Sequence, residues 1–307
     1  MKLSVVIPAH NEAENIRATI LELLETAKSL KGIVEFRIVV VDDHSTDRTF
    51  DVVNGMKDPR VSCIRLSRRA GSHVALRAGM AFVHDSAVLC LSADGQDAPS
   101  ALPEMIAKMK EGVNIVWALR FNRDNEPLRI RLFAQLFYWV LFMLCKIDTN
   151  IDLSRADFFL LDRNVVSAVN VCQERNTSLF GLILWLGFEQ SYVEYERRQR
   201  RLGSSKWDFK SKARLARDWV IAFSGVPLRL VTLIGGLVSI VGFMLIFYVM
   251  FYAIFYSNRV SGWASLMITL LTMGGIQMIM LGVIGEYLWK NLDETRKRPL
   301  YFIEKTS

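Results

Sequence analysis

The chain has 307 residues, of which 51% are hydrophobic, and its 38 Lys and Arg against 31 Asp and Glu give a net charge of +7. This length allows one substantial α/β domain and a further segment beside it. The basic residues form no stripe interleaved with aromatic side chains, so we do not expect nucleic-acid binding. The cysteines have no metal-binding or disulfide spacing and are expected to be reduced thiols: Cys63, Cys90, Cys145 and Cys172.

Short apolar runs alternate with amphipathic segments over the first 119 residues. A helix is predicted over Ala13–Ser29, whose apolar residues recur on one face. Repeated strands and helices with short loops predict an α/β fold with a mainly parallel, doubly wound sheet. The predicted strands are Leu3–Ile7, Glu35–Val41, Val61–Leu66, Ala87–Leu91 and Asn114–Ala118.

Polar residues follow three of these strands at the point where each one ends. The carboxyl ends of parallel strands meet at one edge of a sheet, where α/β proteins bind nucleotides. Carboxylate and amide oxygens are the ligands that Mg²⁺ or Mn²⁺ prefers, so the sequence predicts a nucleoside-diphosphate site there. The three segments are Pro8-Ala9-His10-Asn11-Glu12, Asp42-Asp43-His44-Ser45-Thr46-Asp47 and Ser92-Ala93-Asp94-Gly95-Gln96-Asp97.

Two further segments are predicted to lie at a membrane surface. Leu132–Cys145 is almost wholly apolar but too short to span a bilayer, so an interfacial helix over 128–146 is favoured over an ordinary core helix. Residues 211–229 combine basic side chains with Trp219 and Phe223, a pattern typical of a juxtamembrane interfacial helix.

Two long segments near the carboxyl terminus lack charge. Leu230–Tyr256 and Val260–Gly285 contain no Asp, Glu, Lys or Arg, which predicts transmembrane helices at about 230–256 and 262–287, within residues 230–289. Basic residues precede the first segment and follow the second, whereas the connector carries only Arg259. The positive-inside rule then predicts a multi-pass protein of the inner (cytoplasmic) membrane, with the amino-terminal domain, the tail 290–307 and both termini in the cytosol.

The three strand-end motifs, in this order, resemble those of the family-2 glycosyltransferases, whose first two strands end in a P-x-x-N-E-like motif and in D-D-x-S-x-D. Other segments narrow the resemblance to the polyprenyl-phosphate sugar transferases, and most closely to the bactoprenol glucosyltransferases used in O-antigen modification. The likeness covers essentially the whole chain. These segments are Leu66–Gly79, Asp157–Arg163, Glu174–Phe188, Arg200–Trp207 and Gly274–Tyr301.

The resemblance implies a GT-A-type fold over a catalytic domain at 1–210 and assigns roles to single residues. The nucleotide sugar would be bound by Pro8, Ala9, His10, Glu12, Asp42, Asp43, Ala93, Asp94 and Gln96. Mg²⁺ or Mn²⁺ would be held by Asp94 and Gln96, with Ser92 at the first position of the D-x-D-x-Q motif. The catalytic residues would be Asp94, Asp157, Arg120, Arg200 and Lys206, of which the three basic ones also grip the donor diphosphate, while Arg120 and Arg131 bind the acceptor phosphate.

The chain departs from that family at four positions. Ser92 replaces the first Asp of D-x-D, and Ser is a weaker metal ligand than a carboxylate. Phe159, Phe180 and Ser72 stand where the family has basic residues. These changes indicate altered handling of the donor or acceptor, or reduced activity, within the same fold.

The expected reaction is an inverting transfer of a hexose, with UDP-glucose as the expected donor, to polyprenyl (undecaprenyl) phosphate at the inner leaflet. A phosphate monoester has a second pKa near ~6 and is largely dianionic at neutral pH, so no strong general base is required. Two alternatives stay open: a transferase that uses GDP-mannose or an amino sugar, and a catalytically degenerate membrane partner that binds nucleotide sugar. A homo-oligomer is suggested by resemblance alone. The absence of a Q-x-x-R-W motif argues against a processive synthase.

Overall fold

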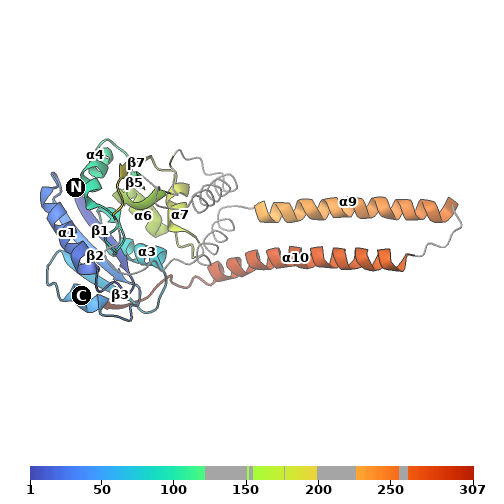
Figure 1. Cartoon of the computed structure of the whole chain (residues 1–307), viewed down its shortest axis with the longest axis horizontal. Helices are drawn as coiled ribbons and strands as arrows, with labels where there is room; N and C mark the ends of the chain where they lie inside the picture. Colours follow the sequence, from blue (N-terminus) through green and yellow to red (C-terminus); the bar gives the residue numbers. More distant parts are fainter. Residues whose placement is uncertain (122–150, 152–154, 176, 199–225, 256–261) are drawn as a thin grey trace. The chain divides into compact units, whose positions relative to one another are not determined.

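The computed structural model describes residues 1–121, 151, 155–175, 177–198, 226–255 and 262–307. The chain divides into two units, one of residues 1–216 with 299–307 and one of residues 217–298. The first unit is an α/β domain and the second contains two long helices (Figure 1). The interfacial helix predicted at 128–146 lies outside the described residues. So do residues 211–225 of the second predicted interfacial helix, at 211–229.

A single mixed sheet forms the centre of the first unit. Among the described residues it has eight strands in the order β7-β5-β6-β4-β1-β2-β3-β8. Only β6 and β8 run antiparallel to their neighbours, which confirms the predicted α/β fold with a mainly parallel sheet. The strands are β1 (Lys2–Ala9), β2 (Glu35–Asp42), β3 (Val61–Leu66), β4 (Ala87–Cys90), β5 (Ile115–Arg120), β6 (Ala156–Leu161), β7 (Gln190–Tyr195) and β8 (Ile303–Thr306).

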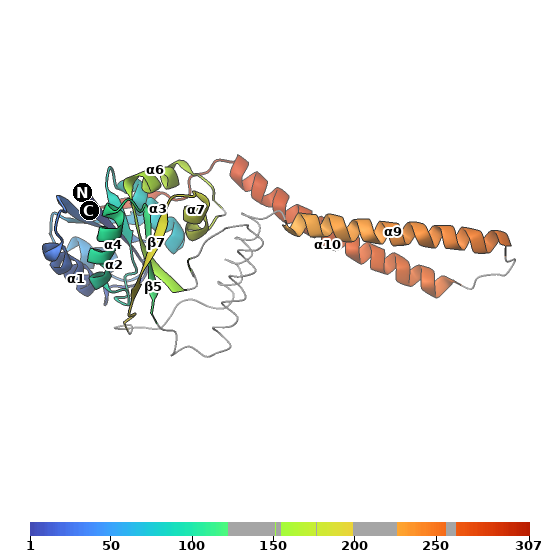
Figure 2. The same cartoon turned by 90° about the horizontal axis from the view of Figure 1, so that it is seen from above.

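Helices cover both faces of this sheet because its side chains alternate along each strand. Leu3, Val5 and Ile7 of β1 pack on one face with α1 (Ile16–Ser29), α2 (Thr49–Asn54) and α4 (Leu102–Lys110), which follows the short helix η1 (Pro99–Ala101). The opposite face carries α3 (Ser72–Phe82), which contacts α6 (Arg163–Val171) and α7 (Leu179–Trp185). Figure 2 shows these two groups of helices on either side of the strands.

An aromatic cluster joins two strands to α3 and α7. Phe180 stacks on Trp117 with 5.6 Å between ring centroids, and Phe159 meets Phe180 edge to face at 5.3 Å. His73 lies 5.5 Å from Phe180, and its Nδ1 accepts a hydrogen bond from the backbone N–H of Leu179 at 3.1 Å. The two phenylalanines that replace family arginines therefore pack against each other, with Phe159 1% exposed.

The cysteines of the described residues are free thiols. Cys63 and Cys90 are buried in the sheet, and Cys172 is half-buried. Burial, together with the nearby charge of Asp42, raises the pKa of the Cys63 thiol to about 12, so it stays protonated and unreactive at neutral pH. Cys145 lies outside the described residues.

The second unit consists of α9 (Val226–Phe255) and α10 (Trp263–Thr295), which contact each other. The approach is close at Gly235, where a Cβ would lie 2.8 Å from the Cε atom of Met280. Many outward side chains of both helices are large and hydrophobic, so the pair buries little of its own apolar surface. Examples are Leu233, Leu237, Phe243, Phe247, Phe251, Leu266, Leu270 and Met278.

One finding corrects the predicted localisation. Within the residues that the structure describes, no helix is long and apolar enough to cross a membrane. The prediction of a multi-pass inner-membrane protein rested on the absence of charged residues from two segments of the sequence. The absence of charge from a segment is a weaker requirement than the combined length and apolarity that a membrane-spanning helix needs.

We predict that Gly79→Ala destabilises the first unit. A Cβ at this position would lie 2.3 Å from Cγ1 of Val6 and 3.0 Å from Cγ2 of Val41, two buried strand side chains that cannot move aside freely. Overpacking of this kind costs about 1–3 kcal/mol. Urea unfolding of the full chain measures the loss. Ala81→Leu, at an exposed position of the same helix, is the control and should change the unfolding free energy by less than about 0.5 kcal/mol. Equal effects would contradict the close approach.

We also predict that His73 makes stability depend on pH. Burial lowers the pKa of His73 from 6.5 to about 4, and protonation would remove the acceptor that holds the Leu179 N–H. The unfolded chain therefore binds a proton between pH 6.5 and about 4 that the folded chain does not. The free energy of unfolding consequently decreases as the pH is lowered through this window, by at most about 1.4 kcal/mol per pH unit. Urea unfolding at several pH values should show a steeper slope for the wild type than for His73→Gln. Identical slopes would refute the assignment.

Candidate functional site

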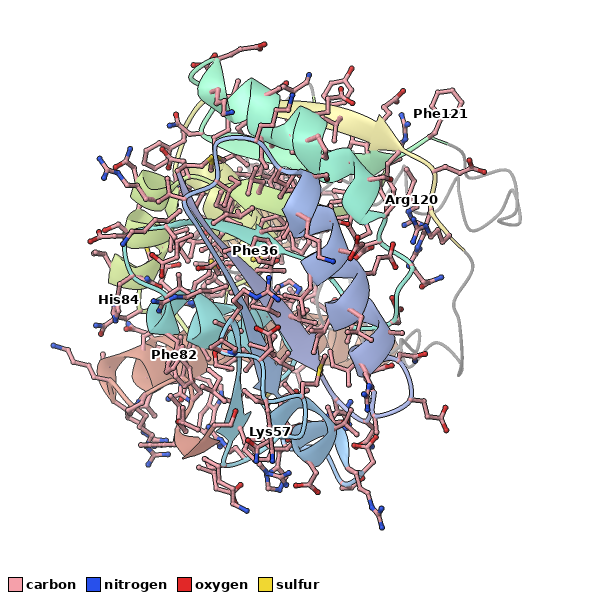
Figure 3. The ribbon with its side chains drawn as sticks, turned by 90° about the vertical axis from the view of Figure 1, so that its left-hand side faces the viewer. Phe36, Lys57, Phe82, His84, Arg120 and Phe121 are labelled. Carbon is pink, nitrogen blue, oxygen red and sulfur yellow. The ribbon has the colours of Figure 1, made fainter. Side chains whose placement is uncertain are left out.

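Five elements bring their polar ends to one edge of the sheet. Because β1, β2, β4 and β5 point the same way, their carboxyl ends lie at this edge, and the antiparallel β6 starts there with Ala156. The strand order places Arg120, Asp157, the segment 92–97, Ala9 and Asp42 along the edge in that sequence. Figure 3 shows Arg120 and Phe121 at the opposite end of the domain from Phe82 and His84.

Two buried carboxylates end β2. Asp42 is 0% exposed, and its carboxylate accepts hydrogen bonds from the Ser45 N–H at 2.8 Å and from Nη1 of Arg65 at 3.2 Å. Asp43 is 4% exposed and accepts the backbone N–H groups of Ala70 and Gly71 at 2.6 and 2.8 Å. A buried carboxylate is stable only with such donors. These bonds therefore fix the turn after β2 and the loop after β3.

The motifs after β1 and β2 bind each other. The backbone N–H groups of Asn11, Glu12 and Ala13 donate to side chains of Ser45, Thr49 and Asp47, at 3.0, 2.9 and 3.1 Å respectively. The helix α1 begins at Ile16, three residues after the predicted Ala13. The polar residues of the two motifs thus build one connected turn structure.

The ends of β1 and β2 also hold strained backbone. Asn11 and His44 adopt positive φ angles of 56° and 54°, a conformation that few non-glycine residues take up. The Asn11 side chain compensates, because its Oδ1 accepts the N–H of Thr46 at 2.8 Å. His10 lies beside them, with Nδ1 2.9 Å from the carbonyl oxygen of Asp43. Strain of this kind is typical of functional turns.

A hydroxyl between two carboxylates follows β4. The Oγ atom of Ser92 lies 2.8 Å from Oδ1 of Asp94 and 2.6 Å from Oδ2 of Asp97. Asp97 is 5% exposed and also accepts the Ser92 N–H at 2.6 Å. Gly95 turns the chain between them with a φ of 72°. Sequence reasoning missed the structural role of Asp97, although this carboxylate stands in the same acidic segment.

Gln96 connects this turn to the segment after β7. Its Oε1 accepts a hydrogen bond from Nη2 of Arg197 at 2.8 Å, and its carbonyl oxygen accepts the Arg198 N–H at 3.1 Å. Arg198 is itself paired with Glu22 of α1. The amide oxygen predicted to bind a metal is therefore held by a cation in this structure, and neither arginine was singled out from the sequence.

Residues that could hold a metal ion are few. In the described parts of the chain, no group of three or more His, Cys, Asp or Glu side chains could hold one. Mg²⁺, however, is commonly bound by one or two carboxylates while its other ligands are phosphate oxygens and water. Asp94 at the sheet edge fits such a shared site, and the neighbouring Ser92 and Gln96 have side-chain oxygen atoms that could serve as further metal ligands.

Arg120 and Asp157 lie on neighbouring strands at the same edge. Arg120 is the last residue of β5, and β5 pairs with β6 through Leu119 and Ala156. The carbonyl oxygen of Arg120 accepts Nε of Arg155 at 2.8 Å, and Arg155 pairs with Glu194 of β7 at 2.6 Å. The strand pairing thus brings Arg120 and Asp157, both predicted site residues, to the same edge. The other predicted basic residues, Arg131, Arg200 and Lys206, lie outside the described residues.

Solved structures with similar folds are known. Glucosyl-3-phosphoglycerate synthase from Mycobacterium tuberculosis, in complex with Mn²⁺ and UDP-glucose, superposes with a TM-score of 0.52 at 17% identity over 72% of this chain and 78% of its own. Mannosyl-3-phosphoglycerate synthase from Rubrobacter xylanophilus gives 0.51 at 20% identity, covering 73% of each chain. At these identities the likeness shows a shared GT-A-like fold.

Sequence comparison extends over the full length. Residues 4–169 match the family described as Glycosyl transferase family 2. The chain is 36% identical to an uncharacterized glycosyltransferase, YkcC, of Bacillus subtilis, covering 100% of this chain and 94% of that one. It is 34% identical to a prophage bactoprenol glucosyl transferase homolog of Escherichia coli, covering 99% of each, and 33% identical to the bactoprenol glucosyl transferase of Shigella phage SfII, covering 100% and 98%. With its sheet, its strand-end motifs and these relatives in agreement, the chain belongs to glycosyl transferase family 2.

Proposed function

We infer that the protein transfers a hexose from a nucleotide-diphosphate sugar to a polyprenyl phosphate. The observation that carries this inference is the likeness, over the whole chain, to relatives named bactoprenol glucosyl transferases. The convergence of Asp42, Asp94 and Arg120 at one sheet edge supports it, because a nucleotide sugar offers a base, a diphosphate and a sugar to one elongated site. UDP-glucose is the proposed donor, in line with the synthase of similar fold that was solved with it.

The nucleoside half of this site is built by the ends of β1 and β2. Asp42 and Asp43 are buried and hydrogen-bonded, so they shape the turns rather than offer open charge. The main chain and side chains of Pro8, Ala9, His10 and Glu12, on the neighbouring strand end, would complete the surface for the base and ribose. A preformed surface lowers the entropic cost of binding the nucleoside.

The diphosphate half lies beside Asp94. We propose that Asp94 and Gln96, with Ser92 next to them, hold Mg²⁺ or Mn²⁺ jointly with the donor diphosphate. A divalent ion there supplies positive charge that stabilises the departing nucleoside diphosphate. For this role Gln96 would exchange its bond to Arg197 for the ion, and Arg197 would become available to a phosphate oxygen.

The acceptor chemistry requires cations more than a base. The attacking oxygen belongs to a phosphate that is largely dianionic at neutral pH, so it needs no deprotonation. We propose that Arg120, Arg131, Arg200 and Lys206 draw this dianion towards an anionic donor. Asp157, on the strand beside Arg120, would then position the arginines or the sugar. Attack opposite the leaving diphosphate inverts the anomeric centre.

One observation favours a second candidate function. Ser92 supplies a hydroxyl where the family has a carboxylate, so the metal site carries one negative charge fewer. A degenerate partner that binds nucleotide sugar without turnover would tolerate this loss. Formation of a lipid-soluble product from labelled UDP-glucose and polyprenyl phosphate in detergent decides between the two. Parallel reactions with GDP-mannose and amino-sugar donors identify the sugar.

We predict that Asp94→Asn lowers transfer at least about 100-fold, because the amide keeps the shape and the Ser92 contact but loses the charge that holds the ion. Product formation from labelled UDP-glucose across an Mn²⁺ titration measures this. Asp58→Asn, which removes an acid that pairs with Arg60 in a remote turn, is the matched control and should leave transfer unchanged. Full activity of Asp94→Asn with an unaltered metal titration would exclude the metal role.

For Ser92→Asp we predict activation at a lower Mn²⁺ concentration than in the wild type. The new carboxylate would stand beside Asp94 and Asp97, and three neighbouring negative charges attract a divalent cation more strongly than two. Ser92→Asn, of similar size but uncharged, controls for the change of volume. The midpoint of activation by Mn²⁺ is the measurement. A midpoint that does not differ between the two variants would place Ser92 away from the ion.

A further inference from the structure

The last strand of the chain returns to the nucleoside half of the site. β8 pairs antiparallel with β3, with Thr306 opposite Ile64 and Ile303 opposite Leu66. Backbone bonds extend this pairing at both ends, since the Ser307 N–H donates to the Cys63 carbonyl and the Ser67 N–H donates to the Phe302 carbonyl, each at 2.9 Å. Residues 302–307, which we call the tail strand, therefore cover the edge of the sheet beside β3.

A chain of side chains leads from the tail strand to Asp42. Glu304 accepts a hydrogen bond from Nε of Arg65 at 3.2 Å. The same guanidinium donates through Nη1 to Asp42 at 3.2 Å and through Nη2 to the carbonyl oxygen of Ser45 at 3.0 Å. The Arg65 side chain is 20% exposed and that of Asp42 is 0% exposed, so the contact between them is shielded from water and screened less than a surface ion pair. The Glu304 side chain is 38% exposed and approaches Arg65 from the solvent side.

A second line of contacts runs through the backbone to Asp43. The Phe302 carbonyl holds the N–H of Ser67, which begins the loop after β3. Three residues later this loop donates the N–H groups of Ala70 and Gly71 to Asp43. The tail strand thus touches the supports of both β2 carboxylates, one through a side chain and one through the main chain.

We propose that the tail strand contributes to nucleotide binding by supporting the nucleoside half of the site, and that Glu304 is a positioning residue for the nucleotide. Glu304 orients the Arg65 guanidinium, which has five N–H donors in a rigid fork and uses three of its nitrogens here. Without Glu304 one of the three anchors is lost, and the turn from Asp42 to Ser45 is held less firmly. This inference rests on the function proposed above.

Glu304→Ala should raise the KM for the nucleotide sugar by about 5- to 30-fold, with kcat and the KM for polyprenyl phosphate nearly unchanged. Glu304→Gln, which can still accept the Arg65 hydrogen bond, should show a smaller rise. Glu25→Gln is the matched control, because this exposed acid pairs with Lys28, three residues further along α1. Calorimetric titration of the full chain with UDP and Mn²⁺ measures the same loss without the acceptor, and a thermal melt shows that the variants are folded.

A double-mutant cycle tests whether Glu304 acts through Arg65. In an Arg65→Gln background, Glu304→Ala should change UDP affinity by less than twofold. Hydrogen exchange in the absence of nucleotide should show faster exchange of the Ser45, Ala70 and Gly71 amides in Glu304→Ala than in the wild type. Additive effects in the cycle, an equal rise in both KM values, or unchanged affinity and exchange would overturn the proposal. If the wild type binds no UDP, UDP-glucose fails as the proposed donor, and the exchange of these three amides still decides the positioning role.

Discussion

Two adjacent buried carboxylates, Asp42 and Asp43, organise the α/β domain of the first unit. Asp42 and Asp43 end β2 in a position with almost no solvent, and each needs donors that only other segments supply. The donors are the Ser45 N–H, the Arg65 guanidinium and the amides of Ala70 and Gly71. The need to satisfy this pair therefore ties together the turn after β2, the strand β3 and the loop that follows it. The first strand joins the same structure because the N–H groups of Asn11, Glu12 and Ala13, which follow it, donate to the side chains of Ser45, Thr49 and Asp47.

The two halves of the proposed site consequently differ in character. The nucleoside half is built from groups that already bind one another, so its acids act mainly by fixing the shape of the main chain. The phosphate half carries its polar groups at the sheet edge, where Asp94, Gln96 and Arg120 are half-buried. Gln96, which follows the interior strand β4, is held by Arg197, which follows the edge strand β7. The aromatic packing of Phe159 and Phe180 lies behind this edge and gives those two replacements a structural explanation.

The sequence predicted the elements whose signal is local. The buried apolar runs of β1 to β5 and the one-sided helix α1 were placed to within a few residues. It did not predict β8, because Ile303-Glu304-Lys305-Thr306 has a single apolar residue and forms a strand only by pairing with β3. The motif residues of the site were predicted because oxygen-bearing side chains follow the strand ends. Arg65 and Arg197 were missed because they bind residues that are distant in the sequence. The role of Asp97 was missed because its partner, Ser92, lies within the same motif. The membrane spans were predicted from the length of two uncharged segments, and the inner-membrane topology from the basic residues that flank them. This prediction is wrong, because no helix among the described residues is long and apolar enough to cross a membrane.

The long separation between β3 and β8 has a consequence for how the protein is made. Arg65 and Glu304 are 239 positions apart, so ribosomes working at roughly 5–20 residues per second need about 12 to 50 seconds to supply the partner of β3. The other strands of the sheet can pair during that time, while β3 presents an open edge to any passing extended segment. The nascent chain thus carries a temporary aggregation hazard beside its nucleoside turns, and the arrival of the tail strand both removes that hazard and finishes the ion-pair chain around Asp42.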